Sequence, residues 1–319
     1  MKLACVFPGQ GSQAVGMLAD FLAVEAVSQL VAAADESLPL TDNGQKLSAL
    51  IANGPAEDLA LTVNTQPAML LAGVGCYRAW LAAGGPPAQI VAGHSLGEYS
   101  ALVVAQVLEP GAAFALTRLR AQAMQSAVPV GMGSMAAILG LDDDSVAAVC
   151  SQAATETKGQ VAPANFNAPS QVVIAGHSGA VTRACELAKE AGAKRALPLS
   201  VSAPFHSALL KPAGDQLQTA LDAIPLKTPE VPVVNNVDVS IESDPLRIRD
   251  ALVRQAYSPV RWVEVVQKLR EQGATHVIEF GPGKVLTGLC GRIDKSLTAA
   301  CVFDSASLDK ALAMLRDAT

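Results

Sequence analysis

The sequence lacks any segment long and apolar enough to cross a membrane. No apolar run approaches the roughly 20 residues that span a bilayer. The apolar stretch at the start, within MKLACVF, ends at Pro8 and Gly9, which makes it too short for a signal peptide. A cytoplasmic location without a membrane partner is therefore expected.

Paired cysteines and concentrated charge are lacking as well. The six cysteines show no C-x-x-C pair and no metal-ligand spacing, so we expect reduced, mostly packed thiols without a disulfide or a metal site. The formal net charge is -6 without a block of like charges, which argues against a nucleic-acid partner bound through Lys and Arg. An anionic substrate would need a cation placed locally.

The hydrophobic pattern predicts an α/β protein. Half of the 319 residues are hydrophobic, enough for one large domain or two smaller ones. Apolar runs of strand length alternate with Ala-rich helical stretches, as in α/β folds. The first part of the chain is predicted to hold strands at 3–7 and 89–94, helices up to Ala83, a helix from Leu96 toward Leu108, and another from Pro110.

The pattern changes between residues 129 and 200. Strands around SMAAILGL, QVAPANFN, QVVIAGH and RALPLSV, with helices after Asp142 to Asp144 and from Ser178, give the order βαββαβ. This is the split order of ferredoxin-like units, so 129–200 is predicted to be an inserted small domain. Residues 1–128 and 201–319 then form one discontinuous large domain, with a strand at 231–237, helices at 249–257 and 262–272, and a strand at 275–280.

The strongest local signal for chemistry is the motif GHSLG at residues 93–97. It follows a predicted strand and opens a predicted helix, which is the setting of a nucleophile elbow with Ser95 as the nucleophile. The glycines allow neighbouring backbone to approach closely, and the turn leaves the Leu96 amide free at the helix N-terminus, where it can face an oxyanion.

A serine nucleophile needs a base, and only four histidines are available. His94 is adjacent to the serine and should point away as a packed or hydrogen-bonded support. His177 and His276 lie in ordinary strand and turn patterns. His206 follows the strand that leaves the small domain, in a loop shaped by Pro204 and Phe205, and is the best candidate for the general base.

An acid that would complete a hydrolase triad is not evident. Asp142, Asp143 and Asp144 lie at a helix start, where capping and the helix dipole explain them. We therefore expect no triad acid at this site.

Arg120 is predicted to point inward. Residues at helical spacing from it are apolar, whereas Arg118 lies on the opposite side, beside glutamines, and is expected to face solvent. A buried guanidinium requires an anion. Either a carboxylate of the protein or a carboxylate of the substrate could serve.

Two glycine-rich loops, FPGQG at 7–11 and FGPGK at 280–284, follow predicted strands. Neither is a phosphate loop, because Lys284 is followed by Val285 rather than by Ser or Thr. We expect tight strand exits at the rim of the active site. The first loop could supply an oxyanion amide near Gln10.

Together these motifs resemble the malonyl-CoA:acyl carrier protein transacylases of fatty acid synthesis. The resemblance runs from residue 1 to about residue 300 and rests on FPGQGSQ, GHSLGEYSAL, Arg120 in TRLRAQ, NFNAPSQVVIAG, a Phe-His pair, VPVVNNVD and EFGPGKVL. It implies an α/β-hydrolase-like large domain with a parallel central sheet and a ferredoxin-like small domain. The pair Ala121-Gln122 after Arg120 departs from a more usual glycine-containing pair, which affects the expected shape of the pocket.

The resemblance also implies roles for single residues. Ser95 matches the acylated nucleophile and His206 its base, while the Gln10 and Leu96 amides match the oxyanion hole. The backbone carbonyl of Gln255 matches the group that orients the imidazole, which accounts for the missing acid. Arg120 matches the arginine that pairs with the malonyl carboxylate. Asn165 matches a region near the pantetheine arm, and Phe205 resembles the bulky residue of members that favour malonyl over methylmalonyl.

The implied reaction is ping-pong transfer of malonyl from malonyl-CoA, through Ser95, to the phosphopantetheine thiol of acyl carrier protein. No bound cofactor or metal is required, and the carrier protein is a transient partner of an enzyme that we expect to be monomeric. Lys189, Lys194 and Arg195 are candidates for carrier contacts, although solvated surface residues explain them equally well. Primary fatty acid synthesis and polyketide synthesis both fit.

Two other classes of function fit the same elbow. A serine esterase or thioesterase would use water as the acceptor of the acyl group. A non-catalytic docking protein would keep the fold and bind the carrier protein without forming an ester at Ser95.

Overall fold

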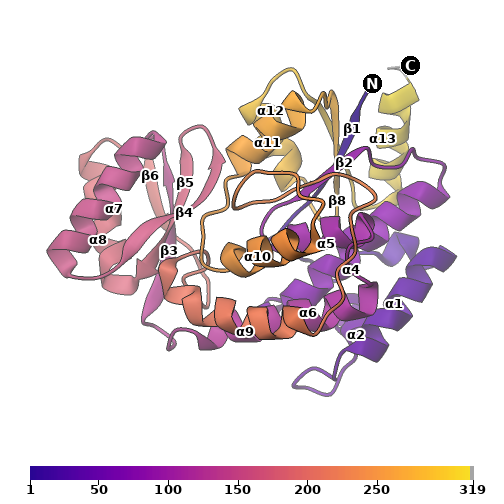
Figure 1. Cartoon of the computed structure of the whole chain (residues 1–319), viewed down its shortest axis with the longest axis horizontal. Helices are drawn as coiled ribbons and strands as arrows, with labels where there is room; N and C mark the ends of the chain where they lie inside the picture. The colour runs from indigo at the N-terminus through magenta and orange to yellow at the C-terminus, as the bar shows by residue number, and fades with distance from the viewer. Residues whose placement is uncertain (317–319) are drawn as a thin grey trace.

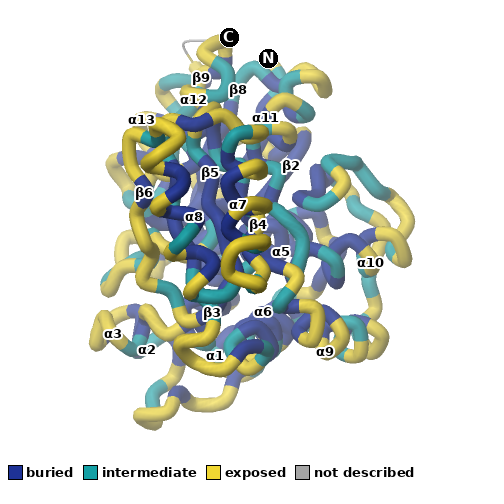
Figure 2. Tube along the Cα trace, turned by 90° about the vertical axis from the view of Figure 1, so that its left-hand side faces the viewer, coloured by how far each residue is buried: buried dark blue, intermediate teal, exposed yellow. Residues whose placement is uncertain are grey.

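The computed structural model describes residues 1–316, which form a mixed α/β molecule with two separate sheets (Figure 1). A larger body holds a parallel sheet and most of the helices, and a smaller body at the left of the figure holds an antiparallel sheet. The start of the chain and the last described residues lie near each other on the larger body in both Figure 1 and Figure 2. No helix in this range is both long and apolar enough to span a membrane.

The larger sheet has five parallel strands in the order β7-β2-β1-β8-β9. They are β1 (Leu3–Phe7), β2 (Ile90–Gly93), β7 (Val233–Val234), β8 (His276–Phe280) and β9 (Thr298–Val302). Every residue of β1 is buried. Leu3, Cys5 and Phe7 pack against one layer of helices, whereas Ala4 and Val6 pack against the other. Burial on both faces explains why this strand is a continuous apolar run in the sequence.

Helices cover both faces of this sheet. One layer contains α1 (Glu25–Ser37), α2 (Leu47–Asn53), α4 (Thr62–Ala82), α5 (Gly97–Val104), α6 (Pro110–Ser126), α9 (Lys211–Asp222), α10 (Pro245–Gln255) and α13 (Ser305–Arg316). The other contains α11 (Trp262–Glu271) and α12 (Val285–Ile293). The short helices are η1 (Ala19–Phe21), α3 (Ala56–Leu59) and η2 (Ala208–Leu210). The tube in Figure 2 shows buried backbone running through the middle of this assembly.

The smaller body has the predicted order of elements. It consists of β3 (Gly133–Leu139), α7 (Asp143–Thr157), β4 (Val161–Ala168), β5 (Gln171–His177), α8 (Ser178–Glu190) and β6 (Arg195–Pro198). Its strands pair antiparallel in the order β4-β5-β3-β6. One face of the sheet packs against α7 and α8, and the other carries a small apolar cluster with Met135 and Val173, against which Phe205 packs.

Helix starts follow the capping signals of the sequence. Asp142 caps α7 by accepting a hydrogen bond from the Ser145 amide at 2.7 Å, as the sequence predicted. Pro110 occupies the first turn of α6, where its missing amide hydrogen has no cost.

Several predicted elements are shorter than expected, such as β6, which covers only Arg195–Pro198 of the segment RALPLSV. The helix from Leu96 ends at Val104 rather than near Leu108, because Gln106 adopts a left-handed conformation (φ 61°) and the chain turns back. The strand at 231–237 is reduced to two residues, because the Asn235 side chain accepts hydrogen bonds from the amides of Asp238 and Val239 and fixes a turn.

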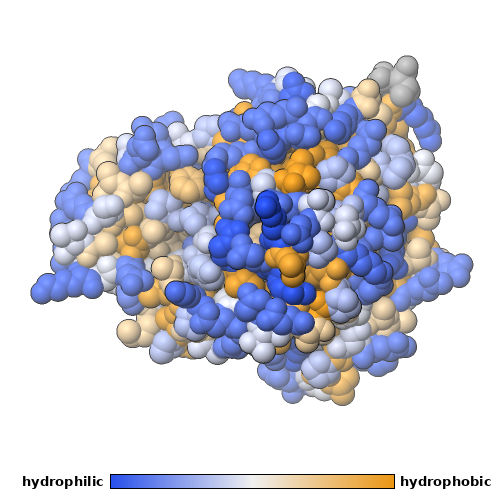
Figure 3. All heavy atoms as spheres, in the orientation of Figure 1, coloured by the Kyte–Doolittle hydropathy of each residue, from blue (hydrophilic) through white to orange (hydrophobic). Residues whose placement is uncertain are grey.

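The surface of the molecule is mostly polar on the face that Figure 3 displays. Hydrophilic residues cover much of this face, and apolar atoms reach it in patches between them.

The smaller body is joined to the larger one by backbone hydrogen bonds between Val260 and β4, at Ala164 and Phe166. This connection brings the Asn165 region of β4 to the end of the parallel sheet where Ser95 lies.

Candidate active site

Ser95 occupies a sharp turn between β2 and α5. Its φ of 53° is in the left-handed region, which is uncommon for a residue with a side chain and is characteristic of a strained functional position. A Cβ on Gly97 would lie 1.9 Å from the Phe7 carbonyl oxygen, and one on Gly93 would lie 1.8 Å from the Gly97 carbonyl carbon. The G-x-S-x-G pattern therefore reflects backbone contacts that only glycine permits.

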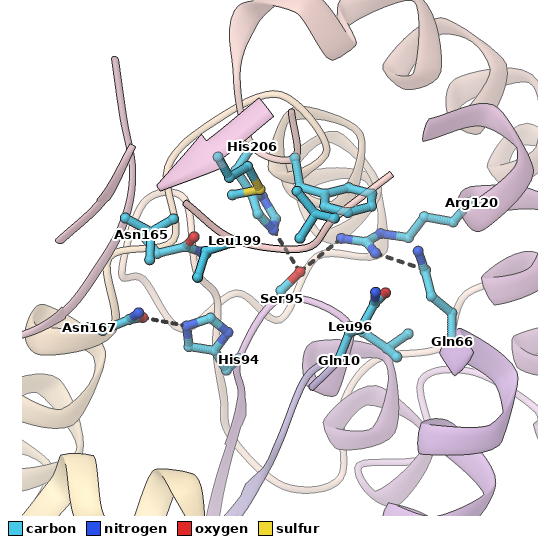
Figure 4. Close-up of a pocket in the computed structure, with 14 residues that line it drawn as sticks. Gln10, Gln66, His94, Ser95, Leu96, Arg120, Asn165, Asn167, Leu199 and His206 are labelled. Carbon is cyan, nitrogen blue, oxygen red and sulfur yellow. Dashed lines mark hydrogen bonds between the residues drawn. The ribbon is translucent and has the colours of Figure 1, made fainter. Parts of the chain in front are cut away.

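His206 lies directly at the Ser95 hydroxyl. The Ser95 Oγ is 2.7 Å from His206 Nε2 (Figure 4). His206 Nδ1 is 2.9 Å from the backbone carbonyl oxygen of Gln255. Because a carbonyl oxygen only accepts, Nδ1 carries the proton and Nε2 is free to accept the serine proton. The partner of Nδ1 is thus a backbone carbonyl rather than the carboxylate of a triad.

The surroundings of His206 keep its imidazole neutral. Burial, followed by the positive charge of Arg120, lowers the pKa of His206 to about 3, although the hydrogen bond to Gln255 acts in the opposite direction. A neutral imidazole at physiological pH is the form that can act as a general base.

Arg120 points inward from α6 and is only 2 % exposed. Its Nη2 donates to Ser95 Oγ at 3.1 Å and to Gln255 Oε1 at 2.9 Å, and its Nη1 donates to Gln66 Oε1 at 2.8 Å. The guanidinium also lies 5.4 Å from the centre of the Tyr99 ring. Within residues 1–316, all its hydrogen-bond acceptors are neutral and it forms no ion pair. The sequence left open whether a carboxylate of the protein or one of the substrate pairs with Arg120. No carboxylate within residues 1–316 forms a hydrogen bond or an ion pair with it.

Gln10 and Leu96 lie beside Ser95 on two different elements. Gln10 follows β1, and its side-chain oxygen is held by the Thr62 hydroxyl at 2.9 Å, while Leu96 stands at the N-terminus of α5. Among the described residues, neither backbone amide donates a hydrogen bond to another protein group. Two amides at the edge of the pocket are thus available to an oxygen of a bound molecule.

A pocket of about 240 Å³ opens over Ser95 (Figure 4). Its wall on the side of the smaller body is apolar and is formed by Met135, Val173, Leu199, Val201 and Phe205. Its polar lining includes Asn165 and Asn167 from β4, together with Gln66 and Arg120 from the helices. The Asn165 side chain, which is 7 % exposed, donates to no protein group in the described range and lies at the pocket wall.

The other three histidines have structural partners. His94 Nε2 is 2.8 Å from Asn167 Oδ1, so it ties the elbow to β4, as its predicted role of support requires. His177 Nδ1 accepts from the Gln160 amide at 2.9 Å, and His276 Nδ1 lies 2.9 Å from the Thr275 hydroxyl.

Sequence reasoning did not single out several side chains that organise this site. Asn236 accepts from the Ser95 amide at 2.7 Å and donates to the Gly93 carbonyl at 2.7 Å, which fixes both sides of the elbow. Gln66 and Asn167 line the pocket, and Glu98 lies just beneath it. Asn236 was part of the recognised VPVVNNVD segment, whereas nothing in the pattern around Gln66 distinguishes it from a core helix.

A serine on a strand-to-helix turn, a neutral imidazole and two available amides are the arrangement typical of acyl-transfer enzymes. The family model described as "Acyl transferase domain" matches residues 4–300. Similar proteins include the malonyl CoA-acyl carrier protein transacylase of Escherichia coli K12, 53% identical over 98% of this chain and 99% of that protein. The Bacillus subtilis transacylase of the same name is 44% identical over 99% of this chain and 98% of its own length. The chain belongs to the acyltransferase family of malonyl CoA-acyl carrier protein transacylases.

Solved structures agree with this assignment. An acyl-carrier-protein S-malonyltransferase from Burkholderia pseudomallei superimposes with a TM-score of 0.94 and 60% identity, covering 98% of this chain and 100% of that chain. A malonyl-transacylase solved in complex with a type II PKS acyl-carrier protein has a TM-score of 0.93 and 51% identity, with coverage of 98% and 99%.

Proposed function

We propose that this chain transfers a malonyl group from malonyl-CoA to the phosphopantetheine thiol of an acyl carrier protein, through a malonyl ester on Ser95. The observation that carries the proposal is a buried guanidinium without a carboxylate partner, directed at the nucleophilic hydroxyl. A carboxylate on the acyl group supplies the missing anion at this position.

In the first half-reaction, Ser95 Oγ attacks the thioester carbonyl carbon of malonyl-CoA, and His206 Nε2 takes the serine proton. The Gln255 carbonyl stabilises the resulting imidazolium at Nδ1. The Gln10 and Leu96 amides hold the negative oxygen of the tetrahedral intermediate. The intermediate then releases the CoA thiolate, which takes the proton from His206, and the malonyl ester remains on Ser95.

In the second half-reaction, the thiol of the carrier's phosphopantetheine arm replaces CoA in the pocket. His206 takes the thiol proton, and the thiolate attacks the ester carbonyl carbon. When this intermediate collapses, the bond to Ser95 Oγ breaks and the serine oxygen recovers its proton from His206. The same base therefore serves both directions of transfer, and the cycle uses no bound cofactor.

Arg120, Asn165 and Phe205 shape the binding of the substrate. Arg120 binds the malonyl carboxylate. This contact replaces hydrogen bonds that the guanidinium makes to neutral groups in the structure without substrate. The amide of Asn165 is a hydrogen-bonding group for the pantetheine arm, which carries amides of its own. Phe205 belongs to the apolar wall and limits the space for a branch on the acyl chain.

The finer architecture belongs to the same proposal. Residues 1–128 and 201–316 form an α/β-hydrolase-like domain, which is supported by the parallel sheet and the serine at the end of β2, and the last three residues of the predicted range lie outside the described residues. Residues 129–200 form a ferredoxin-like domain, supported by the antiparallel order β4-β5-β3-β6. A cytoplasmic location is supported by the six free cysteines, since a reducing compartment keeps thiols unpaired.

The test is mass spectrometry of the intact protein after mixing with malonyl-CoA in the absence of any carrier. The wild-type protein should gain one malonyl group on the peptide that contains Ser95, and holo acyl carrier protein should remove it. Ser95→Ala should gain nothing. Rapid loss of the adduct to water without carrier would favour a thioesterase, and the absence of any adduct would leave a binding protein.

A further inference from the structure

Glu98 is a buried carboxylate that the mechanism above does not use. It lies on α5, three residues after the nucleophile, and is only 2 % exposed. Its Oε2 accepts from Gln255 Nε2 at 2.8 Å and from the Asn236 amide at 3.0 Å. Among the described residues it forms no ion pair, so its contacts are hydrogen bonds to neutral groups.

The carboxylate decides which way the Gln255 side-chain amide faces. Glu98 can only accept when ionised, so Gln255 must present its NH2 group to it, and that group also donates to the Ser95 carbonyl at 3.0 Å. The amide oxygen is thereby turned toward Arg120, which can only donate. The reversed amide would set donor against donor at Arg120 and acceptor against acceptor at Glu98.

The amide orientation in turn determines the position of Arg120. Nη2 of Arg120 is shared between Gln255 Oε1 and Ser95 Oγ, while Gln66 holds Nη1. A buried donor that loses an acceptor is costly, so a reversed or mobile Gln255 amide would move the guanidinium away from the serine. Glu98 thus acts on Arg120 through one intervening side chain.

The orientation of the Gln255 amide is strictest when Glu98 is ionised, because only then does the carboxyl group lack a donor of its own. Burial raises the pKa of Glu98 to about 7, while the hydrogen bonds from Gln255 and Asn236 and the positive charge of Arg120 oppose the shift. One oxygen can accept from both donors in either protonation state, because a neutral carboxyl group keeps a carbonyl oxygen. The other side of Glu98 borders a small cavity that Asn235 and Glu242 also line.

We propose that Glu98 is a positioning residue for malonyl selectivity, which orients the Gln255 amide and through it the Arg120 guanidinium that receives the substrate carboxylate. This inference rests on the proposed function, since it assumes that Arg120 binds the malonyl carboxylate. Glu98 itself does not touch the substrate. Glu98 also accepts a hydrogen bond from the Asn236 amide, and the Asn236 side chain fixes the elbow. The experiment must therefore distinguish a role in selectivity from a purely structural role.

The separating measurement compares kcat/KM for malonyl-CoA and acetyl-CoA, since acetyl has no carboxylate for Arg120. Glu98→Leu removes the acceptor at similar volume. We expect its kcat/KM for malonyl-CoA to fall by about 10- to 100-fold more than that for acetyl-CoA, mainly through KM. Glu98→Gln keeps an acceptor oxygen for Gln255 and should retain most of the selectivity. Glu242→Gln is the matched control, because the Glu242 side chain lines the same small cavity but does not contact Gln255.

A second variant keeps the test valid if Glu98→Leu fails to fold. Gln255→Met preserves the backbone carbonyl that orients His206 but removes the side-chain amide. It should lower malonyl selectivity in the same way. Where both variants fold, the double variant should lose little more than either single one, because both changes break one chain of contacts.

Three results would overturn the inference. Equal losses on malonyl-CoA and acetyl-CoA would mean a structural role. Unchanged selectivity in Glu98→Leu and Gln255→Met would mean that Arg120 is held without them. A loss in Glu98→Gln as large as that in Glu98→Leu would mean that charge matters rather than amide orientation. A wild-type protein that fails to take malonyl onto Ser95 would overturn the proposed function as well, so the two failures are distinguishable.

Discussion

The Nη2 atom of Arg120 lies 3.1 Å from the hydroxyl oxygen of Ser95, so the buried cation and this serine share one pocket. The guanidinium is therefore close enough to contact the far end of a short acyl group carried on the serine. An acyl group of a few carbons with a terminal carboxylate fits this separation, whereas an uncharged acyl group would leave the cation without an anion.

The first prediction concerns this cation. Arg120→Ala should lower kcat/KM for malonyl-CoA by about 10- to 100-fold, because a buried charge-assisted contact of about 1.5–3 kcal/mol is lost. Transfer of acetyl from acetyl-CoA should be spared or should rise. Steady-state assays with both donors and one carrier protein measure the two values. Parallel losses on both donors would contradict a role in carboxylate recognition.

How far the sequence predicted this site can be judged from its individual residues. Ser95 and His206 were singled out because the glycines and the strand-to-helix setting leave a local pattern, and because only four histidines had to be compared. The structure places the two side chains 2.7 Å apart. The inward position of Arg120 followed from helical periodicity. Gln66, Asn236 and the side chain of Gln255 were not found, because they reach the site from α4, from the end of β7 and from α10 through tertiary contacts.

The second prediction concerns the pH dependence of transfer. With its pKa lowered to about 3, His206 stays neutral down to pH 5, so kcat/KM should show no acid limb between pH 7 and 5 that belongs to this histidine. A histidine with the ordinary pKa of about 6.5 would lose about 25-fold in its neutral fraction over the same range. Glu98 titrates nearby, so the profile should be repeated in Glu98→Gln. An acid limb near pH 6 in both proteins would count against the neutral base.

The third prediction concerns His206, the proposed general base. His206→Ala should reduce the rate of Ser95 acylation by about 100- to 10,000-fold, because the hydroxyl proton then has no acceptor at 2.7 Å. Stopped-flow or quenched-flow measurement of the malonyl adduct gives the rate. His94→Ala, at a histidine bonded to Asn167, should affect acylation far less. Equal losses in the two variants would argue for another base.

The fold shows the same division between local and tertiary information. The run LACVF, the capping Asp142 and the order βαββαβ are local or periodic features, and all were predicted. The early end of the strand after Val234 was not predicted. It depends on the Asn235 side chain, which accepts hydrogen bonds from two backbone amides and fixes a turn.

The fourth prediction concerns the glycine that allows the elbow to form. Gly97→Ala should prevent or strongly disturb folding, because the new Cβ would lie 1.9 Å from the Phe7 carbonyl oxygen and neither backbone segment can yield cheaply. Gly288→Ala on α12 is the matched control. Apart from the backbone of its own helix, no atom lies within 4 Å of the position that a Cβ would take there, and the change should stabilise the helix by about 0.5–1 kcal/mol. Thermal unfolding midpoints distinguish the two, and similar midpoints would contradict the backbone clash.

The last prediction concerns the stability of the folded protein and the charge of Glu98. Burial raises the pKa of Glu98 to about 7, above its ordinary value of 4.5, so between these pH values the folded protein keeps a proton that the unfolded chain releases. The contribution of Glu98 to the free energy of unfolding therefore falls as pH rises from about 4.5 to 7. Glu98→Gln removes this dependence, so the stability of the variant relative to wild type should increase by up to about 3 kcal/mol between pH 5 and pH 8. Urea unfolding at both pH values measures the difference. If the difference in stability between the variant and wild type is the same at both pH values, the pKa of Glu98 in the folded protein is close to its ordinary value, and the charge of Arg120 offsets the effect of burial.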